Sequence, residues 1–159
     1  MQHSVIDQQK PALAFLHDYY LTEHYLVFPD LSLRFNPKDM FGPEKSPMVF
    51  DADYKMRWGI IKRDHQPGDP VRWFTTEQPG HLWHVVNGWE ETRDDGGTDI
   101  VLFAPVFRSY PSNLPIHNPQ EPHAKFNKWR LNLDNGQVTE DRVLLDHFYE
   151  RPSFNTAYI

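Results

Sequence analysis

Short runs of apolar residues recur along this chain of 159 residues, each lying between turn-forming residues. Runs of this length, bounded by Pro, Gly, Asn or Asp, indicate β-strands rather than helices. The strands that we expect cover residues 12–16, 25–28, 48–50, 58–61, 71–74, 82–86 and 100–104. The last run is almost entirely apolar, so we expect a strand that is buried on both faces. The pattern therefore predicts an all-β protein.

The clearest local pattern is a β-hairpin formed by residues 125–133 and 137–145. Polar and apolar positions alternate along its first strand, which places every second side chain on one face. The side chains of that face are Asn127, Trp129, Leu131 and Leu133. The sequence Asn135-Gly136 between the two strands favours the positive φ angles that a tight turn requires.

Loops and turns separate these strands along the whole chain. Residues 92–98 are polar and rich in glycine, and residues 109–123 carry four prolines, so both segments are expected to be surface loops. One helical turn is expected at residues 37–41, where Asn36 can cap it. No internal repeat can be aligned and no linker divides the chain. We therefore treat residues 1–159 as a single unit.

Composition excludes several classes of protein. The formal net charge of -6 argues against a nucleic-acid partner, because phosphate binding requires a basic surface. No run approaches the roughly 20 apolar residues of a membrane-spanning helix. The chain has no cysteine, so any metal must be bound by histidine nitrogens and carboxylate oxygens.

General catalytic motifs do not identify a function. The nine histidines include no His-x-His pair, no His-Glu-x-x-His helix and no group of three that are close in sequence. The chain also lacks the Gly-x-Ser-x-Gly motif of serine hydrolases and any glycine-rich phosphate loop. From composition and spacing alone, this is a β-rich domain of unknown function.

Five sequence blocks nevertheless occur in the order found in one family. Residues 17–25 read His-Asp-Tyr-Tyr-Leu-Thr-Glu-His-Tyr, which resembles the His-Asp-Phe-Ala-Ile-Thr-Glu-Asn-Tyr pattern of the carotenoid oxygenase family. The other blocks that are similar to family motifs are residues 46–51 with 57–63, 83–91, 129–136 and 149–155. The resemblance covers the chain from about Leu16 to its last residue. It is strongest to the plant branch that cleaves 9-cis-epoxycarotenoids.

The resemblance implies a fold and a metal site. The fold is a partial seven-bladed β-propeller with antiparallel blades, long loops and short helical turns. Family members hold Fe(II) on the propeller axis with four histidines, and three glutamates accept hydrogen bonds from those histidines. His17 matches an iron ligand, and Glu90 and Glu150 match two of the glutamates. The other three iron-binding histidines are expected outside this chain, and the Glu90 carboxylate is expected to bond to the His17 ring.

Simpler interpretations exist for each of these residues. His17 could be a histidine at a strand end that bonds to the backbone, Glu90 could belong to an exposed acidic pair, and Glu150 could form a surface ion pair with Arg151. His84 follows Trp83 in an apolar run, and we interpret it as a core histidine rather than a ligand. The histidines that we expect at the surface are His24, His65, His117, His123 and His147.

The resemblance also implies a function. We expect an Fe(II)-dependent dioxygenase that cleaves a carbon–carbon double bond of a carotenoid or apocarotenoid with O2, giving two carbonyl products and needing no organic cofactor. Its partners are then an apolar polyene and O2, and the resemblance leaves open a peripheral contact with a membrane surface. A plastid location follows if the epoxycarotenoid resemblance holds, and a cytoplasmic one otherwise. We expect the isolated 159-residue fragment to be inactive. The alternatives are a catalytically dead propeller fragment or binding module, and a stilbene-cleaving relative.

Overall fold

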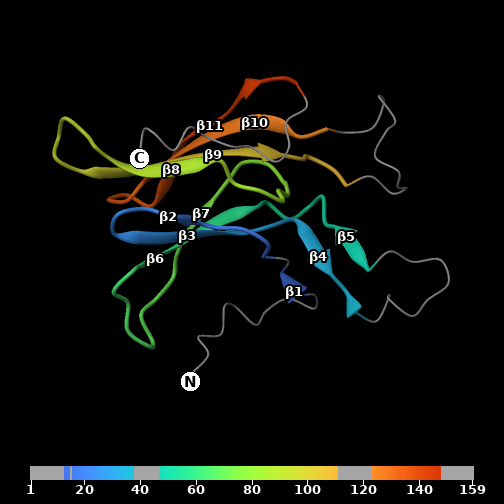
Figure 1. Cartoon of the computed structure of the whole chain (residues 1–159), viewed down its shortest axis with the longest axis horizontal. Helices are drawn as coiled ribbons and strands as arrows, with labels where there is room; N and C mark the ends of the chain where they lie inside the picture. Colours follow the sequence, from blue (N-terminus) through green and yellow to red (C-terminus); the bar gives the residue numbers. More distant parts are fainter. Residues whose placement is uncertain (1–12, 15, 38–46, 111–122, 148–159) are drawn as a thin grey trace.

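The structure is a computed structural model that describes residues 13–14, 16–37, 47–110 and 123–147. Eleven β-strands and no α-helix occur among these described residues. The strands are β1 (Leu13–Ala14), β2 (Tyr20–Leu21), β3 (Tyr25–Asp30), β4 (Leu33–Phe35), β5 (Met48–Phe50), β6 (Arg57–Lys62), β7 (Arg72–Thr75), β8 (Asn87–Thr92), β9 (Thr98–Val106), β10 (Lys125–Asn132) and β11 (Gln137–Leu145). They form three sheets with the orders β1-β4-β5, β2-β3-β6-β7 and β11-β10-β9-β8 (Figure 1). All their pairings are antiparallel, which confirms the all-β prediction.

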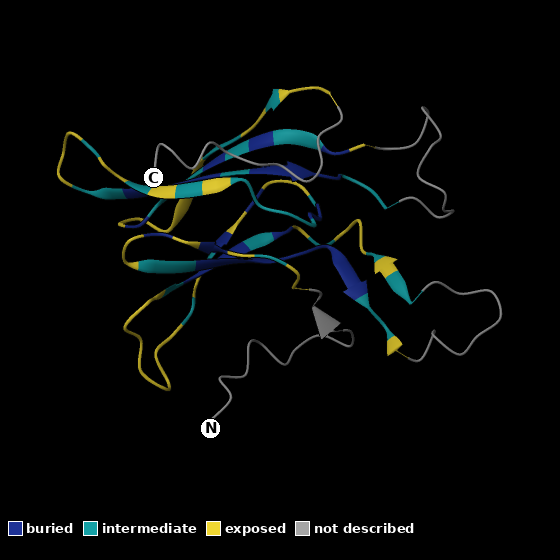
Figure 2. Ribbon diagram, viewed as in Figure 1, coloured by how far each residue is buried: buried dark blue, intermediate teal, exposed yellow. Residues whose placement is uncertain are grey.

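The two four-stranded sheets pack face to face, with β2 beside β8 and β7 beside β11. Their facing side chains form the core, in which the rings of Trp58 and Trp129 meet with centroids 5.2 Å apart. Tyr20 packs edge-on against Trp58 from the first sheet, at 5.7 Å. Figure 2 shows the buried residues concentrated in the strands of these two sheets. Removal of these large rings from water supplies the main force that holds the sheets together.

Most of the strands follow the apolar pattern of the sequence. The strands predicted at residues 25–28, 48–50, 58–61 and 71–74 are confirmed as β3, β5, β6 and β7, to within two residues at each end. β9 contains the run predicted to be buried on both faces, and all of its residues except Thr98 and Phe103 are buried.

The predicted hairpin of β10 and β11 is also confirmed. The face predicted to be buried is buried, from Asn127 at 1% exposure to Leu133 at 7%. Gly136 adopts a φ of 76°, as the turn requires. The Asn132 side chain accepts hydrogen bonds from the backbone N–H groups of Asp134 and Asn135, which further fixes the turn.

The strand predicted at residues 82–86 is wrong. His81 forms a single bridge with Phe107, and the chain then leaves the ladder until β8 begins at Asn87. Leu82 is buried by packing in the core rather than by strand pairing. A short apolar run does not distinguish these two forms of burial.

Other differences concern strand limits and the loops. β3 continues through Pro29, which lies beyond the last pairing with β2, at Val27. Proline is tolerated where a strand has a partner on one side only. Of the strand predicted at 12–16, the structure describes Leu13–Ala14 as β1. The predicted loop at 92–98 connects β8 to β9, whereas the helical turn at 37–41 and the loop at 109–123 lie largely outside the described residues.

Both four-stranded sheets expose apolar side chains on the faces that point away from the shared core. On the first sheet, Leu21 is 56% exposed, and Tyr19 lines a depression of about 460 Å³ together with residues of β3 and β6. On the second sheet, Trp89 is 43% exposed and stacks on Phe103. Exposed apolar faces of this kind are typical of surfaces that pack against another element. Within the described part of the chain, no helix is long and apolar enough to cross a membrane.

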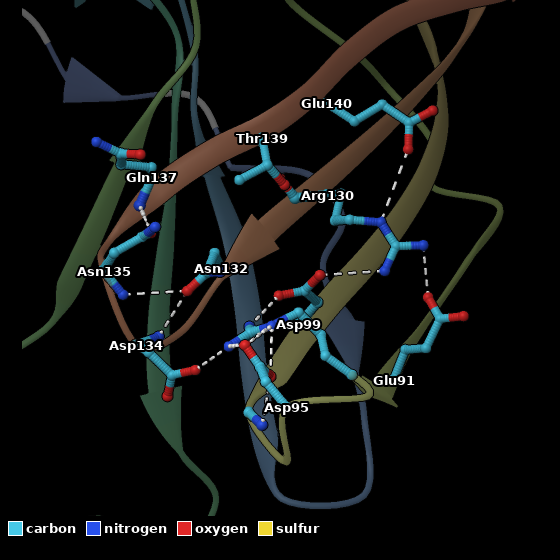
Figure 3. A network of polar contacts seen from close by, with 12 residues as sticks. Glu91, Asp95, Asp99, Arg130, Asn132, Asp134, Asn135, Gln137, Thr139 and Glu140 are labelled. Carbon is cyan, nitrogen blue, oxygen red and sulfur yellow. Dashed lines mark hydrogen bonds and ion pairs between the residues drawn. The ribbon is translucent and has the colours of Figure 1, made fainter.

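A charged network joins the strands at one end of the second sheet (Figure 3). The Asp99 side chain, only 3% exposed, accepts hydrogen bonds from Arg93 Nη1 at 2.6 Å and from Arg130 Nη1 at 3.1 Å. Arg93 also pairs with Asp134 in the β10–β11 turn, and Arg130 pairs with Glu91 of β8 at 2.6 Å. The network therefore links β8, β9, β10 and the hairpin turn through one buried carboxylate.

Candidate metal-binding site between the two sheets

Each four-stranded sheet has one strand that begins immediately after a histidine-containing segment. His17 lies three residues before Tyr20, the first residue of β2, and His84 lies three residues before Asn87, the first residue of β8. β2 and β8 are the edge strands of their sheets, and they lie next to each other. The two histidines therefore occupy equivalent positions in two sheets of the same topology.

This equivalence brings the two imidazoles together. Their ring centroids are 5.3 Å apart, and the ring planes make an angle of 81°. His17 is exposed and His84 is half-buried, and the edge of Trp83 lies against His17 at 6.1 Å. Two imidazoles bound to one ion by metal–nitrogen bonds of about 2.1 Å have ring centres roughly 4.5–5.5 Å apart. The pair therefore fits two ligands of a single metal ion.

The contacts between β2 and β8 show that the two strands run in the same direction. Backbone ladders pair β2 with β3 and β8 with β9, so side chains make the link between the two sheets. These contacts join residue 18 with 85, residue 20 with 88 and residue 22 with 90. The Tyr20 hydroxyl also donates to the carbonyl of Phe103, at 2.9 Å. The register places His17 beside His84 at the start of the two strands.

Glu90 lies at the other end of this seam. Its Oε1 accepts hydrogen bonds from the Thr22 hydroxyl at 2.6 Å and from the His24 backbone N–H at 2.7 Å. Its Oε2 pairs with His24 Nδ1 at 2.8 Å. Burial opposes ionisation, but the hydrogen bonds from Thr22 and His24 lower the pKa of Glu90 below its ordinary value. The hydrogen bond and charge of Glu90 raise the pKa of His24.

These contacts mean that Glu90 does not form the expected bond with His17. Five residues of nearly extended chain separate His17 from Thr22, which is roughly 16 Å at about 3.3 Å per residue. The resemblance matched Glu90 to a glutamate near an iron ligand, but here its carboxylate joins the β2–β3 turn to β8.

The interpretation of His84 as a core histidine is also wrong, since its side chain is partly exposed beside His17. The buried histidine of this segment is His81, which is 1% exposed and stacks on Phe107 at 4.9 Å. Burial lowers the pKa of His81 to about 4, so its ring is neutral near pH 7. A signal for His84 existed in the sequence, because its block begins with the same kind of His-containing segment before a strand.

The remaining predicted residues are placed as follows. The exposed positions of His24, His65, His123 and His147 confirm that they are surface histidines. Glu150 and His117 lie outside the described residues. No group of three or more His, Asp or Glu side chains that could hold a metal occurs among the residues that the structure describes. The pair of His17 and His84 is therefore part of a candidate site rather than a complete one.

Comparison with known proteins identifies relatives of this chain. The model of the family described as retinal pigment epithelial membrane protein matches residues 1–159. A chloroplastic 9-cis-epoxycarotenoid dioxygenase of Oryza sativa subsp. japonica is 34% identical over 156 residues, which make up 98% of this chain and 23% of the rice protein. A carotenoid 9,10(9',10')-cleavage dioxygenase of Crocus sativus is 39% identical over 93 residues, 58% of this chain and 16% of the crocus protein. The chain thus spans about a quarter of the length of the rice relative, and less of the crocus one.

Solved structures share the fold. A variant of Synechocystis apocarotenoid oxygenase superposes with a TM-score of 0.69 at 21% identity, covering 91% of this chain and 30% of that protein. A lignostilbene dioxygenase of Pseudomonas brassicacearum superposes with a TM-score of 0.66 at 24% identity, covering 88% of this chain and 29% of that protein. The antiparallel sheets described above therefore have the fold of β-propeller oxygenases.

Proposed function

This chain belongs to the retinal pigment epithelial membrane protein family, the carotenoid oxygenases, and from that membership we propose its reaction. The protein is a dioxygenase that uses Fe(II) and O2 to cleave one carbon–carbon double bond of a carotenoid or apocarotenoid, releasing two carbonyl products. The rice relative acts on 9-cis-epoxycarotenoids and the crocus relative on carotenoids, which supports this substrate class. The chloroplastic rice relatives support a plastid location.

The observation that carries the proposal is the pair of imidazoles of His17 and His84. A neutral imidazole binds a transition metal through one ring nitrogen, and a site built from neutral nitrogens suits Fe(II). Two rings from adjacent strands of different sheets can bind one ion from two directions, with ring centroids 5.3 Å apart. When bound, Fe(II) supplies the centre at which O2 is activated for reaction with the alkene.

The surrounding residues orient the two ligands. Trp83 lies against His17 and limits the rotation of its ring. The exposure of His17 leaves one side of the pair open, where further ligands, O2 and substrate can approach. Glu150 remains a proposed hydrogen-bond acceptor for an iron-binding histidine, by its match to the family motif.

Separate alanine variants of His17 and His84 test this function in the longest protein that the gene encodes. Each variant should lose bound iron and the ability to cleave an epoxycarotenoid or carotenoid, because each lacks one ligand. His65→Ala is the matched control: His65 is an exposed histidine of the β6–β7 turn, where its Nδ1 lies 3.0 Å from the carbonyl of Lys62. Glu150→Gln should do less harm, about 10- to 100-fold in iron affinity or activity. Unchanged iron content in His84→Ala would contradict the two-histidine site.

A folded wild-type protein that contains no iron and cleaves no carotenoid would contradict the proposal as a whole. It would favour the inactive scaffold. Products from a stilbene, without any from a carotenoid, would contradict the proposed substrate class.

A further inference from the structure

Asp18 joins the two segments that carry the candidate metal ligands. It follows His17 directly, and its Oδ2 accepts a hydrogen bond from the backbone N–H of Val85 at 3.0 Å. Val85 follows His84 directly. The other oxygen of Asp18, Oδ1, accepts from the backbone N–H of Tyr19 at 2.9 Å. One carboxylate is therefore fixed to its own segment and bonded to the segment of the second histidine.

This bond acts where no backbone ladder holds the two histidines. His17 and His84 both lie outside the strands, three residues before β2 and β8, and those strands pair within different sheets. Their separation therefore depends on side-chain contacts across the seam. The Tyr20 and Glu90 links lie farther along the strands, whereas the Asp18 link is one residue from each histidine.

The chemistry of the bond suits this task. A carboxylate that accepts from a backbone N–H forms a shorter and stronger hydrogen bond than a neutral acceptor does. Both oxygens of Asp18 are engaged by backbone N–H groups, so the side chain is directed at the protein chain rather than at the rings. The half-buried position of Asp18 reduces competition from water.

We propose that Asp18 is a positioning residue that holds His17 and His84 at the separation required to bind one metal ion. The inference rests on the proposed function, since it assigns the two rings to one metal. Asp18 is not a ligand in this proposal. Its effect on the metal passes through the backbone at Val85.

Three variants of the longest encoded protein test the proposal: Asp18→Ala, Asp18→Asn and Tyr20→Phe. Tyr20→Phe is the matched control, because it also removes one hydrogen bond between the sheets, from the Tyr20 hydroxyl to the carbonyl of Phe103, from the same segment. The probe is Co(II), with the dissociation constant measured by chelator competition and the coordination followed by visible absorption. Asp18→Ala should weaken Co(II) binding by about 10- to 100-fold, the range for residues that orient metal ligands. Asp18→Asn should remain within about fivefold of the wild type, because its amide oxygen still accepts from Val85.

Three binding results would overturn the proposal. They are wild-type affinity in Asp18→Ala, a loss in Asp18→Asn as large as that in Asp18→Ala, and an equal loss in Tyr20→Phe. The second result would assign the effect to charge, and the third to general destabilisation.

Crystal structures of the metal-free proteins separate this proposal from the proposed function. In Asp18→Ala the ring centroids should move apart from 5.3 Å, whereas in Tyr20→Phe they should not. If the wild type binds no metal but the rings still separate in Asp18→Ala, the positioning role stands and the iron site fails. Rings that remain in place in Asp18→Ala would overturn the positioning role.

Discussion

Replacement of Asp99 by alanine should destabilise the protein far more than replacement of Asp134, although both carboxylates pair with Arg93. Asp99 is 3% exposed and accepts hydrogen bonds from Arg93 and Arg130, whereas Asp134 is 59% exposed (Figure 3). Each charge-assisted hydrogen bond that Asp99 loses is worth about 1.5–3 kcal/mol. The two guanidinium groups are 22% and 26% exposed and keep other carboxylate partners, so water and those partners recover about half of the loss. The expected cost of Asp99→Ala is therefore about 2–3 kcal/mol, against about 0–1 kcal/mol for Asp134→Ala.

Urea unfolding of the longest encoded protein, followed by tryptophan fluorescence, measures both changes. The assay should be repeated at low salt and at about 1 M NaCl, where the Debye length falls to about 3 Å. The effect of Asp134→Ala should disappear at high salt, and most of the effect of Asp99→Ala should persist. Equal costs for the two variants at low salt would refute the reasoning that burial decides the weight of these ion pairs.

Three further outcomes are expected. His24 is stabilising when protonated and its pKa is raised from 6.5, so the loss of thermal stability in His24→Asn should be largest below pH 6.5 and shrink as pH rises through the raised pKa; it should also shrink on acidification below 4.5, as Glu90 is protonated. A loss that grows above pH 6.5 would contradict this. Gly59→Ala should cost about 1–3 kcal/mol in thermal unfolding, because a Cβ there would lie 2.7 Å from ring carbons of Phe28, and Phe28→Leu should recover part of the loss. The isolated 159-residue chain should associate through its exposed apolar sheet faces, and a monomer at micromolar concentration with cooperative thermal unfolding would argue against this.

The fold could be predicted wherever a strand is both long and regular in its pattern. The hairpin of β10 and β11 and the buried β9 follow from residues that are apolar at a period of two or continuously. β2 and β4 are two and three residues long, and their sequences contain no pattern that separates them from the adjacent loops. These strands form because pairing with β3 and with β5 holds them, which is a tertiary effect.

The candidate site was predictable in part. The motif around His17 located one ligand, but the partner assigned to it was wrong because Glu90 and His84 lie in the same sequence block. Sequence similarity identified that block without indicating which of its residues reaches the start of β2. The deciding information is the register between β2 and β8, which is set by hydrogen bonds from residue 18 to residue 85 and from residue 22 to residue 90. Such contacts join different sheets and leave no periodic trace in the chain.

The spacing of His17 and His84 nevertheless contains a rule that the structure makes legible. The three contacts across the seam join residues whose numbers differ by 67 or 68, and the two histidines differ by 67. This constant difference is the length of chain from the edge strand of one sheet to the edge strand of the next. A ligand placed just before one edge strand is therefore repeated just before the next only if the intervening sheet keeps its length and topology. In a propeller whose sheets surround one axis, side chains at these equivalent positions converge on the axis. Insertions in the loops at the outer edge can change the spacing without moving the histidines, because the register across the seam, and not the distance along the chain, determines where they meet.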